Sequence, residues 1–265
     1  MVSHSDLTMY LVAVKSFYHQ VREGRIALLN DGSLTDADRQ VLKMHLRDPQ
    51  IFDMHNVQTG KCPKGGCWER LLTVIDLTQE SYVIQIDSDT VTRGPVEEVV
   101  NSYRANRSFL LGSRRGQQLL PLSEAPKVVE DSTRHDHIQI IAERSFWKVK
   151  NGQNLRYVRA SAGFGGFAKG VFSRKQAEDF STMMQDLMGE KWFDWGSEQV
   201  TSNYLLANAP DPVVLQRPKY TVFYPAVNVE ETAFLHFIGT YRFTQGVYAR
   251  ESQRSIQIIQ QQRKN

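Results

Sequence analysis

One short segment constrains the fold of this chain more than any other. Residues 82–86 form an apolar run, rich in β-branched side chains, that ends abruptly in the carboxylates Asp87 and Asp89. A short apolar run of this kind predicts a fully buried strand of a parallel sheet. Open α/β sheets bind their ligands beyond the carboxyl ends of the strands. The segment therefore predicts a binding site at the end of a buried strand.

The spacing of the two carboxylates indicates what that site binds. Side chains two positions apart face the same side of a strand, so Asp87 and Asp89 are predicted to turn toward one ion while Ser88 points away. Oxygen ligands of this type suit Mg²⁺ or Mn²⁺. The alternative is that the two aspartates only cap a strand end and begin a turn, which is the usual explanation for an isolated Asp-x-Asp.

The composition favours one soluble α/β domain. Of the 265 residues, 41% are hydrophobic and 23% are charged, and no apolar stretch approaches the roughly 18 residues of a membrane span. The polar residues 1–6 do not resemble a secretory leader, so we expect a cytoplasmic protein. The net charge is only +3, which argues against nucleic acid as a partner. Cys62 and Cys67 are too few for a structural zinc site, and we expect them to be reduced.

Hydrophobic periodicity and helix caps predict an alternation of helices and strands. Helices are predicted over 6–21, 35–45, 68–77, 96–103, 173–188 and 197–208. Strands are predicted over 25–30, 82–86 and 108–112. The alternation in the first half predicts a parallel sheet. The class of the apolar run 137–142 is left open, and the polar tail from Gln253 is predicted to be helical.

Two metal-dependent chemistries fit Asp87-Ser88-Asp89. In the first, the carboxylates hold a divalent ion on a nucleotide diphosphate. In the second, that of aspartyl-phosphate phosphohydrolases with Mg²⁺, Asp87 is a nucleophile and Asp89 an acid, and Thr90-Val91 loosely fits the end of that motif. The second chemistry normally places its motif on the first strand and requires a later lysine and a paired acidic site, which the sequence does not locate. It remains the alternative.

Further motifs follow one another along the chain in an order that favours the first chemistry. They are residues 29–33 (LNDGS), 87–89 (DSD), 163–166 (GFGG), 196–199 (GSEQ) and 235–239 (LHFIG). With these motifs the chain resembles the GT-A glycosyltransferases that use nucleotide sugars, particularly their bacterial galactosyltransferase and glycogenin-like branch, from about Ser3 to Tyr248. The resemblance implies a single domain with a mostly parallel, Rossmann-like sheet. Within it, residues 1–112 are the nucleotide and metal half, 113–250 the sugar and acceptor half, and 251–265 a polar tail.

The resemblance also implies roles for individual residues. Donor-binding positions are Asp31, Arg70, Asp87, Ser88, Gly163, Gly165, Gly239 and Arg242. The metal ligands are Asp87, Asp89 and His236, whose neutral imidazole suits Mn²⁺ better than Ca²⁺. Glu198 and Gln199 are the candidates for contact with the reacting sugar. An ordinary core histidine, a surface arginine and a helix-terminal carboxylate are the structural alternatives for His236, Arg70 and Glu198.

The aromatic residues before Glu198 support a sugar site on physical grounds. Trp192, Phe193 and Trp195 are predicted to supply the apolar walls and stacking faces that sugars favour. A divalent cation across the diphosphate would stabilise the charge that develops on the leaving oxygen. We therefore expect a hexosyltransferase that moves a hexose from a nucleotide diphosphate sugar, a UDP sugar in the first instance, to a carbohydrate or glycolipid acceptor. A glycolipid acceptor is compatible with peripheral contact with a membrane.

The chain departs from the family pattern in two places. Only residues 1–4 precede the first helix, so the first strand is short and its nucleotide contacts cannot be transferred to this chain. Residues 239–242 read Gly-Thr-Tyr-Arg where the glycogenin branch has Lys-Pro-Trp, which leaves Arg242 as the substitute for the phosphate-binding lysine. A catalytically silent module that binds a nucleotide or a glycan is the second alternative.

Overall fold

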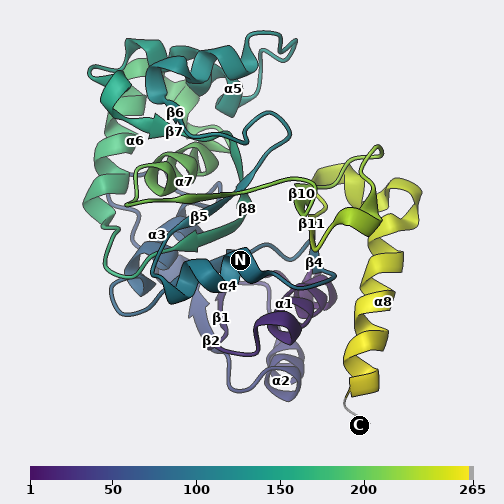
Figure 1. Cartoon of the computed structure of the whole chain (residues 1–265). Helices are drawn as coiled ribbons and strands as arrows, with labels where there is room; N and C mark the ends of the chain where they lie inside the picture. Colours follow the sequence, from purple (N-terminus) through teal and green to yellow (C-terminus); the bar gives the residue numbers. More distant parts are fainter. Residues whose placement is uncertain (263–265) are drawn as a thin grey trace. The chain divides into compact units, whose positions relative to one another are not determined.

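The structure of the protein is a computed structural model, in which residues 1–262 are described. Figure 1 labels the helices and most of the strands along the chain. The helices are α1 (Leu7–Val21), α2 (Asp36–His45), α3 (Trp68–Leu77), α4 (Glu97–Arg104), α5 (Ile138–Ser145), α6 (Arg174–Met188), α7 (Ser197–Ala207) and α8 (Val247–Gln262). The strands are β1 (Ala27–Asn30), β2 (Gln50–Asp53), β3 (Val83–Ile86), β4 (Thr90–Thr92), β5 (Phe109–Gly112), β6 (Leu120–Pro121), β7 (Arg156–Tyr157), β8 (Ala160–Phe167), β9 (Val213–Leu215), β10 (Tyr220–Val222) and β11 (Phe234–His236).

The predicted helices are confirmed, each to within one residue at either end. Local side-chain chemistry explains this agreement. Thr35 and Ser173 begin α2 and α6, and each forms a reciprocal capping box with the residue three positions later. Apart from its first residue, the apolar run 137–142 belongs to α5, and the tail is helical as predicted as far as Gln262. Periodicity and caps are short-range signals, so they locate helices without knowledge of the tertiary fold.

The sheets are mixed, and the α/β class is confirmed. The four-stranded sheet has the order β3-β8-β5-β9, in which β5 is parallel to β9 and antiparallel to β8. A second sheet has the order β10-β11-β4, with a parallel and an antiparallel pair. The parallel pair β1-β2 stands separately, and Val2 extends it by a single parallel bridge to Asn30. Within the described residues, the short first strand that the sequence predicts is therefore present only as this single bridge.

One expectation about strands was wrong, and other strands were not foreseen. Strand β3 lies at the edge of its sheet, and its residues Val83, Ile84 and Ile86 are only partly buried, because an edge strand has a neighbour on one side alone. Strands β2, β4 and β6 to β11 were not predicted from the sequence. Strand β8 is rich in glycine and alanine, which are depleted in strands, so the local pattern did not indicate a strand there.

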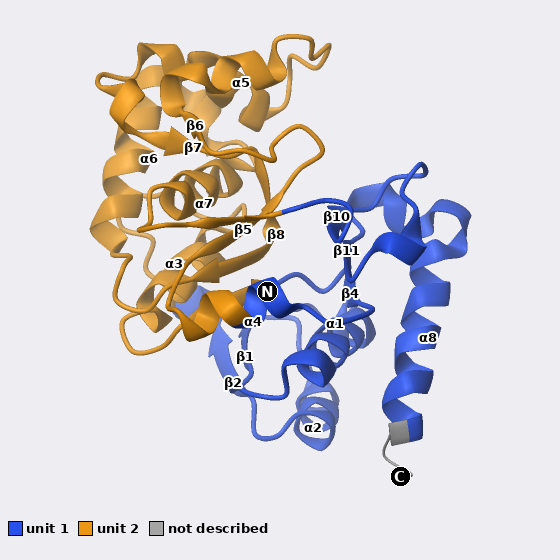
Figure 2. Ribbon diagram, viewed as in Figure 1, with its two compact units in different colours: residues 1–56, 86–100, 216–265 blue, residues 57–85, 101–215 orange. Residues whose placement is uncertain are grey.

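The chain divides into two compact units, which are coloured separately in Figure 2. Unit 1 contains residues 1–56, 86–100 and those from 216 onward, and unit 2 contains residues 57–85 and 101–215. Unit 2 packs around buried aromatic residues that include Trp68, Phe180 and Trp192. Each unit combines segments that are distant in sequence, so the units do not follow the expected division into 1–112 and 113–250. The single domain stays a prediction.

Gly166 offers a direct test of the packing in unit 2. A Cβ atom built at Gly166 would lie 2.2 Å from Cδ1 of Phe109 and 2.3 Å from Oη of Tyr82. Overpacking of this kind costs about 1–3 kcal/mol. We expect Gly166→Ala to lower the free energy of unfolding by that amount in urea denaturation. Gly170→Ala is not a neutral control, since Gly170 has a φ of +73°.

Candidate metal centre and buried carboxylate site

The two carboxylates of the Asp-x-Asp motif lie in a turn of unit 1. Strand β3 ends at Ile86 and β4 begins at Thr90, so Asp87 and Asp89 occupy the turn between them. The hydroxyl of Thr90 donates a hydrogen bond of 2.9 Å to the carbonyl of Asp87 and holds this turn. Asp87 and Asp89 were predicted to face one ion because residues two positions apart in a strand share a side. This reason is wrong, because neither residue lies in a strand. The tight turn brings the two side chains together instead.

His236 joins the two carboxylates through strand pairing. It is the last residue of β11, and the antiparallel register places it opposite Thr90, the residue after Asp89. The backbone N–H of Phe237 donates to the carbonyl of Asp89 at 2.9 Å and extends this pairing. A strand more than a hundred residues downstream thus delivers the imidazole to the turn.

The distances suit one divalent cation. Nε2 of His236 lies 3.0 Å from Oδ1 of Asp89 and 3.9 Å from Oδ2 of Asp87. One ligand atom from each of the three residues lies within 4.8 Å of the others. Metal–ligand bonds of about 2.1 Å place neighbouring ligands of an octahedral ion about 3 Å apart and opposite ones about 4 Å apart. The donor set of two carboxylates and one imidazole therefore fits Mn²⁺ or Mg²⁺.

Electrostatics favour the anionic form of this centre. Burial alone would raise the pKa of Asp89, but the hydrogen bond and charge of His236, together with the charge of Arg242, outweigh it and lower that pKa. Arg242 lies in the 3-10 segment η7 (Gly239–Gly246), where its Nε donates to the carbonyl of Gly239 at 3.1 Å. The structure thus places Arg242 within electrostatic range of the predicted metal ligands.

The other donor-binding candidates of unit 1 lie at element ends. Asp31 follows β1 and accepts hydrogen bonds from the backbone and hydroxyl of Ser33, at 2.9 Å and 2.6 Å. Asp53 ends β2 opposite Asn30 and accepts a hydrogen bond from the Asn30 amide at 2.8 Å. Asp53 is not among the residues predicted from the sequence, although a short apolar segment that ends in aspartate, residues 50–53, was the available signal. Gly239 has a φ of +53° with open space at its Cβ position, which gives a conformational reason for glycine.

Glu198 of unit 2 is held in a buried ion pair. It is the second residue of α7, and its Oε2 lies 3.2 Å from Nη2 of Arg70 on α3. The side chains of Arg70 and Glu198 are 11% and 3% exposed. The indole of Trp68 donates to the hydroxyl of Ser197 at 2.9 Å and fixes the two helix starts together. Arg70, which the resemblance associated with a phosphate or ribose, contacts the candidate catalytic carboxylate in this structure.

The aromatic residues before Glu198 divide into two groups. Trp192 is fully buried and packs edge-on against Trp68, with ring centroids 6.2 Å apart. The expectation that Trp192 lines a sugar site is therefore wrong, because its ring belongs to the hydrophobic core. Phe193 and Trp195 are exposed, so their rings are available for stacking.

The glycine-rich segment 163–166 forms part of β8, where packing requires small residues. A Cβ at Gly165 would lie 3.2 Å from Cδ1 of Leu206. Gly163 is buried in the same strand. Contact of Gly163 and Gly165 with a donor sugar stays a prediction.

A polar network leads from Gln199 into unit 2. The amide of Gln199 donates to Oε1 of Gln139 on α5 at 2.9 Å. Glu143 follows Gln139 by four residues on the same helix and so lies one turn away on the same face. Glu143 is buried, is paired with Arg159, and accepts a hydrogen bond from the hydroxyl of Tyr157 at 3.0 Å. Glutamine and glutamate spaced four apart within a helix were the sequence signal for this network.

The buried Glu143 predicts a pH dependence of stability. Burial raises its pKa to about 7 from an ordinary value of 4.5, against the lowering effects of Arg159 and Tyr157. Between these two values the unfolded chain releases a proton that the folded chain retains, so stability should fall as the pH rises from about 4.5 to 7. The contribution is about 3 kcal/mol. In urea titrations at pH 5, 6, 7 and 8, Glu143→Gln should show a shallower decline than the wild type.

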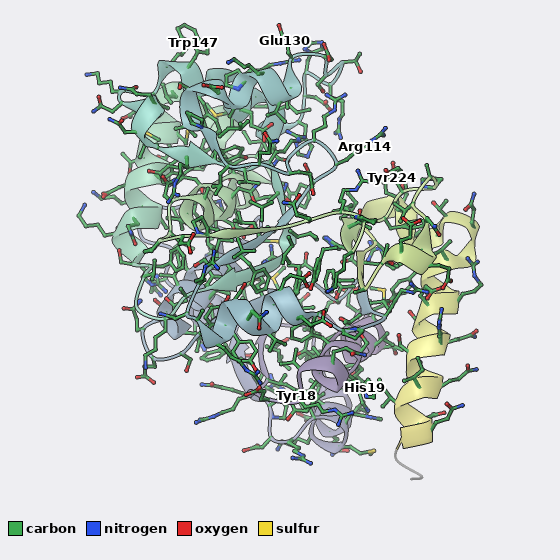
Figure 3. The ribbon with its side chains drawn as sticks, viewed as in Figure 1. Tyr18, His19, Arg114, Glu130, Trp147 and Tyr224 are labelled. Carbon is green, nitrogen blue, oxygen red and sulfur yellow. The ribbon has the colours of Figure 1, made fainter. Side chains whose placement is uncertain are left out.

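Glu130→Gln is the matched control for that experiment. Glu130 is an exposed carboxyl in the same unit and is labelled in Figure 3. Its substitution should leave the wild-type pH dependence in place. Identical slopes for the wild type and Glu143→Gln would contradict the raised pKa of Glu143.

The alternation of helices with mixed sheets, with the turn that carries Asp87 and Asp89 directly after β3, is the arrangement of the GT-A fold. The comparisons agree with this class. An active-site mutant of LgtC shares the fold, with a TM-score of 0.54 and 11% identity over 95% of this chain and 92% of that one. The apo structure of the bifunctional glycosyltransferase WbbM gives a TM-score of 0.51 and 12% identity over 96% of this chain. This chain spans half the length of WbbM, with 50% covered.

Sequence comparisons alone do not place the chain. No family model matches it, and no curated protein matches it. Within residues 1–262, no helix has the length and apolar character needed to cross a membrane. The predicted resemblance to GT-A glycosyltransferases is confirmed at the level of fold.

Proposed function

We propose that this chain is a metal-dependent glycosyltransferase that moves a hexose from a nucleotide diphosphate sugar, in the first instance a UDP sugar, to a carbohydrate or glycolipid acceptor. The observation that carries the proposal is the convergence of Asp87, Asp89 and His236 in the turn between β3 and β4 of a GT-A fold. A bound Mn²⁺ or Mg²⁺ would supply positive charge that stabilises the leaving diphosphate.

The residues of unit 1 have separate roles in this proposal. Asp87 and Asp89 hold the metal as anionic ligands, and His236 adds a neutral nitrogen donor. Arg242 supplies a second positive charge near this centre, which supports its role as the substitute for the missing lysine. Asp31 is proposed to face the nucleotide, and Ser88 and Gly239 to meet it through their backbone.

In unit 2 the proposal assigns the sugar to Glu198 and Gln199. Arg70 holds the carboxylate of Glu198 in one orientation through the buried ion pair. Gln199 is oriented by Gln139, and its remaining amide groups serve the sugar.

The phosphohydrolase alternative receives no support from this geometry. Its motif belongs on the first strand, whereas Asp87 follows β3, an edge strand preceded by β1 and β2 in the chain. The catalytically silent binding module remains the second candidate. The altered segment 239–242 would affect sugar transfer through phosphate binding, and it leaves the fold unchanged.

A thermal-shift titration with UDP, GDP and their sugar conjugates, with and without Mn²⁺, tests the proposal. A ligand that binds only the folded state raises its stability. We expect a rise in Tm that requires both a nucleotide diphosphate and the metal, and that is lost in Asp87→Ala. A metal-dependent donor shift without hydrolysis or transfer across a broad acceptor panel would favour the silent module. A shift with metal and none with any nucleotide would overturn the donor site.

A further inference from the structure

Unit 2 contains a cavity of about 330 Å³ whose walls carry several arginines. Arg114 and Arg115 contribute from the loop after β5, and Arg159 contributes from the residue before β8. Glu143 and Tyr157 form part of the inner wall. The volume lies at the lower end of the range of small-molecule sites, roughly 300–1,000 Å³. This suits one or two sugar rings better than a long oligosaccharide.

The backbone of the loop that carries the two exposed arginines is packed closely against Arg159. The N–H of Ser113 donates to the carbonyl of Arg159 at 3.0 Å, and the N–H of Gly116 donates to the carbonyl of Ser113 at 3.1 Å. A Cβ atom at Gly116 would lie 2.0 Å from the carbonyl oxygen of Arg159. Only glycine permits this approach, so the loop is held in place at the mouth of the cavity.

The charges of the lining favour an anion. Arg159 is paired with Glu143, which therefore offsets one positive charge. Arg114 and Arg115 add two further guanidinium groups at the exposed rim, and Arg114 is labelled in Figure 3. Among the lining residues Glu143 is the single acid, and the lining as a whole is positive. Guanidinium groups bind carboxylates and phosphates through paired hydrogen bonds.

The cavity is linked to the candidate sugar-contact residues within the same unit. Glu143 in its wall lies one helical turn after Gln139 on α5, and Gln139 accepts a hydrogen bond from Gln199, the neighbour of Glu198. An occupant of the cavity would therefore lie against α5, the helix that also contacts the residue next to the proposed sugar-contact carboxylate Glu198.

We propose that this cavity binds the carboxylate or phosphate of an anionic sugar in the acceptor, with Arg114 and Arg115 receiving the oxyanion and Arg159 closing the inner end. The assignment to an acceptor rests on the proposed glycosyltransferase function. Binding of the anionic sugar does not depend on that function, because the cavity shares no residue with the predicted metal centre.

Calorimetric titration of the full chain, without metal or nucleotide, tests the inference. The probes are glucuronate, glucose 6-phosphate, uncharged glucose and inorganic phosphate. We expect one of the two anionic sugars to bind more tightly than both glucose and inorganic phosphate, and its identity distinguishes carboxylate from phosphate recognition. Equal binding of glucose and the anionic sugars would overturn the inference, and so would no binding at all. If inorganic phosphate bound as tightly as glucose 6-phosphate, the cavity would recognise the phosphate and not the sugar. That result would overturn the inference of an anionic-sugar site.

Two variants assign the binding to this cavity. Arg115→Ala, at an exposed position, should weaken binding about 10-fold to 100-fold, as expected for loss of a charged hydrogen-bond donor. Gly116→Ala retains every charge but displaces the loop, and it should weaken binding similarly. Arg25→Ala removes an exposed arginine from unit 1 and should leave the affinity unchanged. Equal losses of affinity in Arg115→Ala and Arg25→Ala would show that the net charge of the protein, and not this cavity, determines the binding. That result would overturn the proposed site.

The outcome is separable from that of the proposed function. Loss of donor binding in the thermal-shift experiment, with anionic sugars still bound, would sink the glycosyltransferase proposal and leave the cavity as an anionic-sugar site. Metal-dependent donor binding without any anionic-sugar binding would support the glycosyltransferase proposal and overturn the anionic-sugar site.

Discussion

Replacing Asp89 by asparagine should reduce metal-dependent sugar transfer by about 100-fold or more. Changes to groups that merely support a metal ligand cost about 10–100-fold in metal affinity or activity, and Asp89 is proposed to be a ligand itself. Asparagine keeps the shape of the side chain and a carbonyl oxygen near His236, but it removes the negative charge. The measurement is the initial rate of transfer as a function of Mn²⁺ concentration.

A loss of charge alone must be separated from a loss of the ligand. Asp131→Asn removes one exposed carboxylate from unit 2 and should retain the wild-type rate. Higher Mn²⁺ should recover part of the Asp89→Asn activity if the defect lies in metal affinity. A fully active Asp89→Asn protein would refute the proposed metal centre.

The second large effect is expected for the ion pair between Arg70 and Glu198. Removing one partner of a buried pair leaves an uncompensated charge and costs about 3–5 kcal/mol. We therefore expect Arg70→Met and Glu198→Leu each to lower the free energy of unfolding by that amount. The double variant should be more stable than either single one, because no unpaired charge remains buried.

The ion pair between Arg174 and Asp76 is a matched control for this cycle. It also joins α3 to another helix, at 2.7 Å, but its side chains are 32% and 51% exposed. Exposed pairs typically contribute less than about 1 kcal/mol, so Arg174→Met and Asp76→Leu should have small effects. Equal losses at both pairs would show that burial of the Arg70 pair is not what sets its energy.

The helices could be predicted closely because their determinants are local. The capping boxes of Thr35 and Ser173 and the apolar periodicity of each segment lie within a few residues of the element they define. Strands depend on partners, so β8 was missed, and the burial of β3 at the sheet edge was overestimated. The α/β class required only the alternation of elements, whereas the mixed directions of pairing required the tertiary fold.

The candidate site divides in the same way. Asp87 and Asp89 could be identified from the sequence as candidate metal ligands, since two carboxylates at the end of an apolar run are a local pattern. The resemblance to a family, and not any local pattern, added His236. Its delivery to the turn depends on the antiparallel register between β11 and β4. The contact of Arg70 with Glu198 and the arginine-lined cavity join residues distant in the chain, and only tertiary packing decides which of them meet. Neighbouring residues determine helix caps, apolar periodicity and the Asp-x-Asp pattern. Strand pairing and contacts between distant residues depend on the whole folded chain.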